Sequence, residues 1–440
     1  MAAIEPNIHP NIDPKLFSLL KFPKNESEVY FTGDLPWLFK DVEYYKTYWL
    51  NKKNEFLNFH KVNQGNIESE LKRGKNLGSA TRTRLEVLKK AHESNYLTLA
   101  QILKSLDVAA APSFDVAVPS HQSLHLYRKN LFRDWGWVTN ENQHAMDLVA
   151  EVVGPNWKPS RTCVLGAGAS RLAMDLHKEF HLPMTVAVDF NPLLLLVANE
   201  MLKGASIKLW DFNTAPVELD SVVKEYELKS NLGTLSDFYL VCADVTELPF
   251  KDHQFNAVVT PWLIDILPFG FKLLAQRVNQ LLEIGGSWVN FGPLGFSHRD
   301  EAMNLTRTEI AEQWKECGFE LESEKVSAIK YLSSDGEVNS RNETVYLFKI
   351  KKVKNVPVEP FEYLPNWLLN PNKPITVSDE LERHKQLIRF QADLFHSIDG
   401  KVSLNQIAQL FAQHYKMPAD TALAMATNVL RQFEESIKRK

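Results

Sequence analysis

The sequence predicts an α/β protein whose main domain is a doubly wound, seven-stranded sheet with an antiparallel last strand. From residue 161 onward, short apolar runs alternate with helical patterns, and the first run, "RTCVLG", ends in a glycine turn before a helix. Such alternation is typical of a parallel sheet with helices on both faces. The first runs are almost continuously apolar, which indicates strands covered on both sides.

The expected elements follow one another in chain order. Strands are predicted at residues 161–166, 184–190, 238–244, 255–261, 285–292, 319–326 and 343–352, and helices at 170–180, 191–202, 270–282 and 307–318. The last two strands are not separated by a long helix. We therefore expect them to form an antiparallel hairpin at one edge of the sheet.

At 440 residues, the chain is longer than one compact core usually holds. The N-terminal part reads as an irregular lead-in to about residue 35, followed by helical periodicity over 37–107. The predicted domains are a mostly helical N-terminal region (1–125), the α/β domain (126–352), a proline-rich linker (353–377) and a small helical domain (378–440).

Composition narrows the function classes. The net charge of −4 argues against a general nucleic-acid binder, which would carry a basic face. Neither a secretory signal nor a run of about 18 apolar residues is visible, so we expect no membrane span. Cys163, Cys242 and Cys317 are odd in number and widely spaced, which disfavours a disulfide scaffold and a cysteine metal site. Buried, inert thiols and a cytoplasmic location are the working expectations.

The glycine turn "LGAGASR" predicts a nucleotide-like cofactor, because Gly166 and Gly168 let a ligand approach bare backbone. Asp189 ends the second strand about twenty residues later, where a carboxylate can accept hydrogen bonds from ribose hydroxyls. Arg171 occupies the place of the third glycine in the dinucleotide fingerprint. This bulky residue argues against a nicotinamide dinucleotide.

Asp244, at the end of the third strand, is expected beside an adenine. Together Asp189 and Asp244 would surround a cationic sulfonium with negative potential, which favours S-adenosylmethionine over an anionic cofactor. A methyltransferase is therefore the first hypothesis. An NAD-dependent oxidoreductase on the same sheet and a non-catalytic cofactor-binding scaffold remain the alternatives.

Three stretches resemble the carnosine N-methyltransferase family over residues 125 to 350. They are "NLFRDWGW", "LGAGASRLAMDL" and "WLIDILPFGFKLLAQRVNQLLEIGGSWVNFGPLGFSH". The resemblance implies a Rossmann-like, S-adenosylmethionine-dependent methyltransferase, with N-methylation favoured over O-methylation. The C-terminal region looks a little like small helical modules of the winged-helix or PqqD type, which implies a peptide partner there.

The resemblance also implies roles for individual residues. Cofactor contacts are expected from Asn130, Arg133, Gly166, Asp189 and Asp244, and substrate contacts from Trp262, Asp265 and His298. Asp265 would accept a hydrogen bond from an imidazole nitrogen and share its developing charge, while His298 would hold the other end of the acceptor. The residues alone also allow plainer readings. These are a helix cap for Asp265, an ion pair with Asp134 for Arg133, a core position for Trp262 and a surface loop for His298.

The sequence departs from the family where the substrate is held. Ser340, Arg341, Asn342 and Glu343 stand where the family has aromatic residues. Its "GAGLGR" is "GAGASR" here, and Pro261 replaces a small thiol residue before Trp262. The residues expected to act in the reaction are thus better retained than those expected to hold the substrate. This predicts a different imidazole or amine as methyl acceptor, in a small molecule or a peptide.

Overall fold

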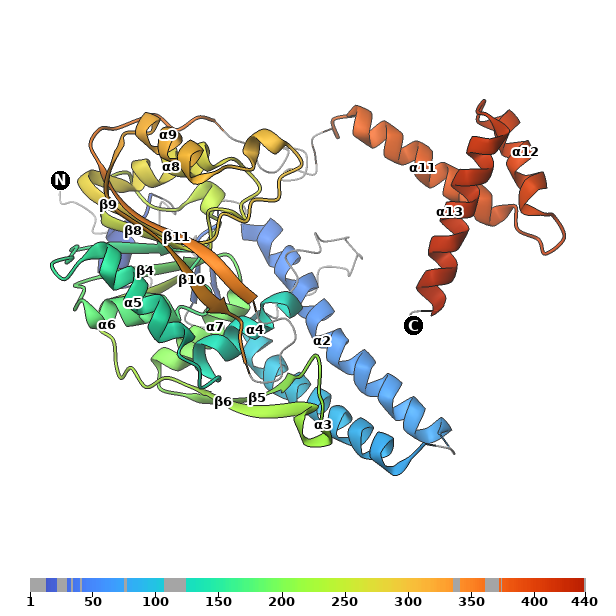
Figure 1. Cartoon of the computed structure of the whole chain (residues 1–440), viewed down its shortest axis with the longest axis horizontal. Coiled ribbons are helices and arrows are strands. Elements are labelled where there is room, and N and C mark those ends of the chain that lie inside the picture. Colours follow the sequence, from blue (N-terminus) through green and yellow to red (C-terminus); the bar gives the residue numbers. More distant parts are fainter. Residues whose placement is uncertain are drawn as a thin grey trace, which may run out of the picture. The chain divides into compact units, whose positions relative to one another are not determined.

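The computed structural model describes residues 13–21, 30–32, 35–39, 42–74, 77–106, 124–334, 341–360, 372 and 374–438. The chain divides into two compact units, Met1–Phe361 and Glu362–Lys440 (Figure 1). Part of the proline-rich linker, residues 361–371 and 373, lies outside the described residues, as does Ser340.

The seven expected strands form the core of one sheet in the order β7-β4-β3-β8-β9-β11-β10. β3, β4, β7, β8 and β9 run parallel, whereas β11 is antiparallel to both β9 and β10. This confirms the doubly wound sheet with an antiparallel last strand. The strand bounds are β3 Thr162–Leu165, β4 Thr185–Asp189, β7 Phe238–Cys242, β8 Phe255–Pro261, β9 Leu282–Gly292, β10 Phe319–Tyr331 and β11 Arg341–Lys352.

Helices cover both faces of this sheet because successive strand residues point to opposite sides. In β3, Val164 belongs to one core, and its neighbours Cys163 and Leu165 belong to the other. The first core includes side chains of α5, α6 and α7, and the second includes those of α8 and α9. The bounds are α4 Leu124–Trp135, α5 Glu141–Val153, α6 Arg171–Glu179, α7 Pro192–Leu202, α8 Phe271–Leu281 and α9 Arg307–Glu316.

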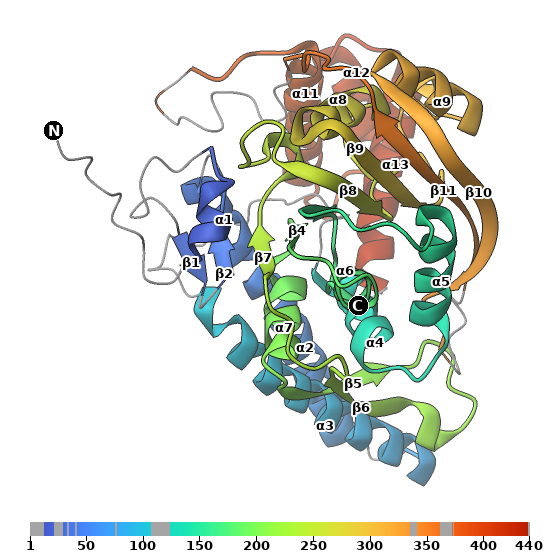
Figure 2. The ribbon, with the colours of Figure 1, turned by 90° about the vertical axis from the view of Figure 1, so that its left-hand side faces the viewer.

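Before the helical N-terminal region, the chain adds two short strands to the sheet. β1 (Tyr30–Thr32) pairs with β2 (Leu35–Trp37), and β2 runs parallel to β7 beyond the expected edge (Figure 2). The prediction that helical periodicity begins at residue 37 was wrong there, because Trp37 lies in β2. A three-residue strand that contains a proline is too short to show a period. A short helix, α1 (Pro14–Ser18), precedes both strands.

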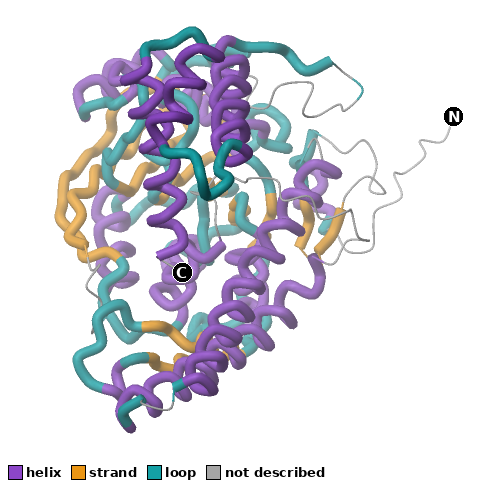
Figure 3. The backbone as a smooth tube through the Cα atoms, turned by 90° about the vertical axis from the view of Figure 1, so that its right-hand side faces the viewer, coloured by secondary structure: helices purple, strands orange, loops and turns teal. Residues whose placement is uncertain are grey.

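Two long helices, α2 (Val42–Arg73) and α3 (Ser79–Ile102), run side by side (Figure 3). A separate antiparallel ribbon packs on α3 and was not predicted; its strands are β5 (Ser206–Phe212) and β6 (Val223–Lys229). Asn95 of α3 fixes this ribbon at Trp210: its Nδ2 donates to the Trp210 carbonyl and its Oδ1 accepts from the Trp210 N–H, both at 2.7 Å.

The second unit contains the helices expected over residues 378–440. They are α11 (Asp379–His396), α12 (Leu404–His414) and α13 (Ala419–Lys438). Phe390, Leu394, Ile407 and Phe411 form its small core together with two alanines of α13. None of the helices described in either unit has the length and apolar character needed to cross a membrane.

The three cysteines are buried and free, as expected. Burial raises the pKa of the Cys163, Cys242 and Cys317 thiols, which keeps them protonated and poorly nucleophilic.

Candidate functional site

The glycine turn between β3 and α6 presents bare backbone. Gly166 and Gly168 have φ of +71° and +58°, a region that L side chains rarely adopt. A Cβ on Gly168 would meet nothing within 4 Å, whereas one on Gly166 would lie 3.0 Å from Leu263. The Ser170 hydroxyl, at the start of α6, is buried and has no hydrogen-bond partner among the described residues. Open space against backbone and an unpaired buried hydroxyl fit a ligand at this turn.

Asp189 joins this turn to the end of β4. Its Oδ2 accepts a hydrogen bond from the Gly168 N–H at 2.7 Å, and its Oδ1 accepts one from the Asn191 N–H at 2.7 Å. Burial raises the pKa of Asp189 to about 6, although these amide donors oppose the shift. The Phe190 N–H is a third donor, so at least one of the carboxylate's roughly four lone pairs is left to accept a hydroxyl hydrogen bond.

Asp244 lies on the neighbouring strand end, as expected. It follows β7 and begins a 3₁₀ helix (Val245–Glu247), where its Oδ1 accepts from the Thr246 N–H at 2.8 Å. Its Oδ2 accepts from the Tyr45 hydroxyl at 2.6 Å. The Ala243 N–H donates to the Asp189 carbonyl at 3.1 Å, so the two strand ends are linked directly. The same sheet edge therefore carries both carboxylates.

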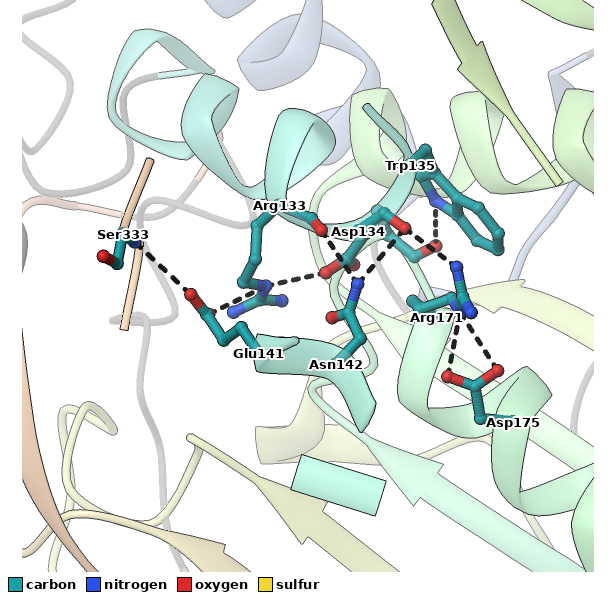
Figure 4. Close-up of polar contacts among 9 residues, drawn as sticks. Arg133, Asp134, Trp135, Glu141, Asn142, Arg171, Asp175 and Ser333 are labelled. Carbon is teal, nitrogen blue, oxygen red and sulfur yellow. Dashed lines mark hydrogen bonds and ion pairs between the residues drawn. The ribbon is translucent and has the colours of Figure 1, made fainter. Parts of the chain in front are cut away.

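Arg171 has a structural explanation. Its Nε bonds both carboxylate oxygens of Asp175, at 3.0 and 2.8 Å, and its Nη1 donates to the Asp134 carbonyl at 3.3 Å (Figure 4). Its guanidinium also lies over the Trp135 ring, whose Nε1 donates to the Ala169 carbonyl at 3.0 Å. The arginine that replaces the third glycine thus ties α4 to the turn.

Arg133, in the last turn of α4, forms the ion pair with Asp134 that the residues alone allow, and its expected cofactor contact stays a prediction. Its Nε pairs with Asp134 at 2.7 Å and lies 3.8 Å from Glu141. The guanidinium also faces two aromatic rings, with centroids 5.8 Å away for Trp262 and 5.3 Å for Tyr331. Burial alone would lower the Arg133 pKa, but the neighbouring acidic groups raise it, so that the side chain stays charged.

Trp262 begins the loop after β8 with a left-handed φ of 46°. Its ring stacks on Tyr331 at 5.0 Å, and its Nε1 donates to Glu343 Oε2 at 2.8 Å. Arg341 Nη2 lies 3.0 Å from the other oxygen of Glu343. Residues of the segment that departs from the family therefore do reach this side of the site. Trp262 is half-buried, with a polar contact that a plain core position would not require.

Asp265 lies in the same loop and is only 7% exposed. Its Oδ2 accepts from the Gly295 N–H at 2.9 Å, while its buried Oδ1 has no partner among the described residues. It does not cap α8, since Gly270 occupies the N-cap. Burial raises the Asp265 pKa; the Gly295 amide lowers it and the charge of Glu343 raises it further. A buried carboxylate oxygen left unpaired is costly unless a ligand donates to it.

His298 and Asn130 have fewer ties to this site. His298 lies half-buried in the loop after β9, where its N–H donates to Asn304 Oδ1 at 2.8 Å. Its ring stacks on Phe296 at 6.1 Å, and no hydrogen bond joins it to Asp265 in the described structure. Asn130 is half-buried on α4, one turn before Arg133.

Sequence reasoning missed Tyr331 and Tyr45. Tyr331 ends the long strand β10, in which Ile329 and Tyr331 are buried and the intervening Lys330 is exposed, so that alternation was an available signal. Tyr45 contacts Asp244, which lies 199 positions away in the sequence, and no local sequence pattern indicates such a contact.

The sheet order, the bare glycine turn and the two strand-end aspartates define a Rossmann-like fold of the S-adenosylmethionine-dependent methyltransferase class. The sequence model described as "Carnosine N-methyltransferase" matches residues 119–354, which is more than half of the chain. The chain belongs to the carnosine N-methyltransferase family. Membership implies S-adenosylmethionine as the cofactor, and the open turn and the two carboxylates fit it.

Individual relatives are distant. The carnosine N-methyltransferase of Dictyostelium discoideum is 22% identical over 188 residues, a match that covers 38% of this chain and 39% of that protein. The chain thus spans about two fifths of the length of the curated relative it matches.

Two solved structures show the level of structural similarity. A SAM-dependent methyltransferase from Methanosarcina mazei is 13% identical with a TM-score of 0.31, and covers 44% of this chain and 92% of its own. The YcgJ protein from Bacillus subtilis is 11% identical with a TM-score of 0.33, and the match covers 48% of this chain and 100% of that protein. Similarities this weak carry no argument about function.

Proposed function

We propose that the protein transfers a methyl group from S-adenosylmethionine to a nitrogen of an imidazole or an amine. The observation that carries the proposal is the unpaired, buried Oδ1 of Asp265. Its loop touches the glycine turn, because Leu263 packs against Gly166. An acceptor that donates to this oxygen would therefore lie close to a cofactor held at the turn.

The cofactor would be held by the sheet edge. The open space beside Gly168 would take the amino-acid part, the carboxylate of Asp189 would accept from the ribose, and Asp244 would meet the adenine. S-adenosylmethionine supplies a methyl group activated by a positively charged sulfur. Arg133, paired with Asp134 and charged over the Trp262 ring, would contact the cofactor from the side of this ring.

The proposed role of Asp265 follows from the chemistry of the acceptor nitrogen. The acceptor nitrogen uses its lone pair to bond the methyl carbon as the carbon–sulfur bond breaks, and it takes over the positive charge. An imidazole, with a pKa of roughly 6.5, is mostly neutral at pH 7 and needs orientation more than a strong base. Asp265 would accept the N–H of the second ring nitrogen and share the positive charge; His298 would hold the far end of the acceptor.

The acceptor itself should differ from carnosine. Glu343 and Arg341 form a charged pair beside Trp262, where the family resemblance leads one to expect aromatic residues. Two carboxylates on this side of the site, those of Asp265 and Glu343, favour an acceptor rich in N–H groups. A peptide brought in by the second unit is the other form that this acceptor could take. We also propose a cytoplasmic location, supported by the three free thiols.

Two experiments test the proposal. Calorimetric titration should detect binding of S-adenosylmethionine but not of NAD, because Arg171 fills the position that a dinucleotide leaves to glycine. Incubation with a labelled methyl donor and a fractionated extract of small molecules and peptides should then label one acceptor, identified by mass. Binding of NAD alone would favour the oxidoreductase, and methyl-donor binding with no labelled product would favour the scaffold.

A further inference from the structure

The N-terminal segment reaches the cofactor edge of the sheet although it precedes the α/β core in the chain. β2 lies beside the end of β7, with Trp37 opposite Cys242 (Figure 2). The Leu38 N–H donates to the Cys242 carbonyl at 2.9 Å. Asp244 comes two residues later. The chain that leaves β2 therefore passes the strand end that carries the expected adenine ligand.

Aromatic side chains gather at this point, and we call three of them, Phe39, Tyr45 and Phe190, the adenine-end cluster. Phe39 and Tyr45 are buried and stacked at 4.1 Å with an interplanar angle of 24°. Phe190 directly follows Asp189 and meets both rings edge-on, at 6.0 and 5.5 Å. The cluster thus joins the N-terminal segment to the ends of both strands that carry the aspartates.

Tyr45 is bonded to the Asp244 side chain itself. Its hydroxyl donates to Oδ2 at 2.6 Å, while Oδ1 accepts from the Thr246 N–H. A hydroxyl bonded to a carboxylate is among the stronger hydrogen bonds in proteins. With one donor on each oxygen, the carboxylate has a fixed orientation and retains a lone pair on each oxygen.

We propose that Tyr45 is a positioning residue of the cofactor pocket, which aims Asp244 at the exocyclic amine of adenine and, with Phe39 and Phe190, encloses that end. The N-terminal segment is then part of the cofactor site. This inference rests on the proposed function, because it takes S-adenosylmethionine as the ligand.

The test is calorimetry on the full-length protein with S-adenosylhomocysteine and with S-inosylhomocysteine, which lacks the exocyclic amine. Tyr45→Phe keeps the ring but removes the hydroxyl. We expect it to weaken adenosylhomocysteine binding about tenfold and inosylhomocysteine binding much less. Tyr239→Phe is the matched control, since its hydroxyl bonds Asp237 at 3.1 Å at the opposite end of β7. It should leave both affinities unchanged.

Each other result has a definite meaning. Unchanged affinity in Tyr45→Phe, or an equal loss for both ligands, overturns the inference. In an Asp244→Asn background, Tyr45→Phe should add no further loss; an additive loss overturns it too. A wild type that binds neither ligand overturns the proposed function instead.

A second measurement needs no variant. If Tyr45→Phe does not fold, hydrogen exchange of the wild type decides. Adenosylhomocysteine should slow amide exchange in peptides that cover residues 35–50. Unaltered exchange there, with ligand bound, overturns the inference.

Discussion

The proposed cofactor edge, at the ends of β4 and β7, and the proposed acceptor wall, formed by Trp262, Tyr331 and Glu343, are built in different ways. At the cofactor edge, Asp189 and Asp244 occupy strand ends, where backbone N–H groups hold both carboxylates and the Tyr45 hydroxyl adds one bond to Asp244. At the acceptor wall, Trp262, Tyr331 and Glu343 come from a loop and two late strands, and they hold one another through side chains. The cofactor edge depends mainly on short sequence motifs, and it suits a single ligand, the cofactor. The acceptor wall can change the acceptor that it binds through substitutions at a few positions.

The largest effect should come from the residue at the junction of the two regions. Asp265→Asn should lower turnover about 100-fold or more, because the amide cannot share the charge that develops on the acceptor. Affinity for adenosylhomocysteine should stay nearly constant, since the Asp265 carboxylate bonds the Gly295 amide and not the glycine turn or Asp189 among the described residues. Steady-state kinetics and calorimetry measure the two.

Asp220→Asn, at an exposed 3₁₀ turn, is the control and should alter neither quantity. Wild-type turnover in Asp265→Asn would remove this carboxylate from the mechanism and break the distinction between the two regions.

Filling the glycine turn should affect the cofactor edge alone. Gly168→Ala puts a methyl group into the open space at the turn, and we expect cofactor affinity to fall by about tenfold or more, or about 1.4 kcal/mol. Gly204→Ala shares the positive φ and the open surroundings but lies beyond α7. Both variants should lose similar thermal stability, and only the first should lose binding. Equal binding by both would mean that the turn does not face the cofactor.

The Asp189 carboxyl should make cofactor affinity depend on pH. Its pKa is raised by burial to about 6, so acidification through that value protonates the group that would accept from the ribose. Affinity should fall several-fold between roughly pH 7 and pH 5. Asp189→Asn should bind more weakly with a flatter profile. Calorimetry across this range checks both, and the same pH slope in wild type and variant would contradict the assignment.

The stability of the free protein should change in the opposite direction. Because the folded-state pKa of Asp189 lies above its ordinary value, the folded state holds more protons than the unfolded state between about pH 4 and 6. This carboxyl therefore contributes stability at low pH that is lost as the pH rises through that window. Denaturant titrations of wild type and Asp189→Asn isolate its share.

The smallest effect should come from the acceptor wall. Glu343→Gln removes a negative charge that raises the Asp265 pKa, so the acidic limb of the pH–rate profile should move to lower pH. The acceptor KM should rise a few-fold, consistent with about 1 kcal/mol for a polar contact. Glu320→Gln, exposed on β10, is the control. An unmoved limb would separate Glu343 from the acceptor chemistry.

Local sequence patterns predicted those parts of the fold that depend on neighbouring residues, namely the sheet strands and the glycine turn. The sheet strands are apolar runs, and the turn at Gly166 and Gly168 is a motif, so both were visible. The ribbon strand Ser206–Phe212 alternates exposed and buried residues, which is a signal for a strand, but this alternation does not identify β6 as its partner. The Asp265 contact with Gly295 and the Trp262 contact with Glu343 join residues far apart in sequence. Only the folded chain reveals them.

The pairing of β2 with β7 bears on how this protein should be handled. A fragment cut to residues 126–352 would retain the motifs described above but would lose β2. The end of β7 would then be an exposed edge of the sheet, and its unpaired backbone groups could pair with another molecule. It would also lack Phe39 and Tyr45. Acceptor screens run on such a trimmed preparation would report an inactive enzyme for reasons unrelated to its substrate.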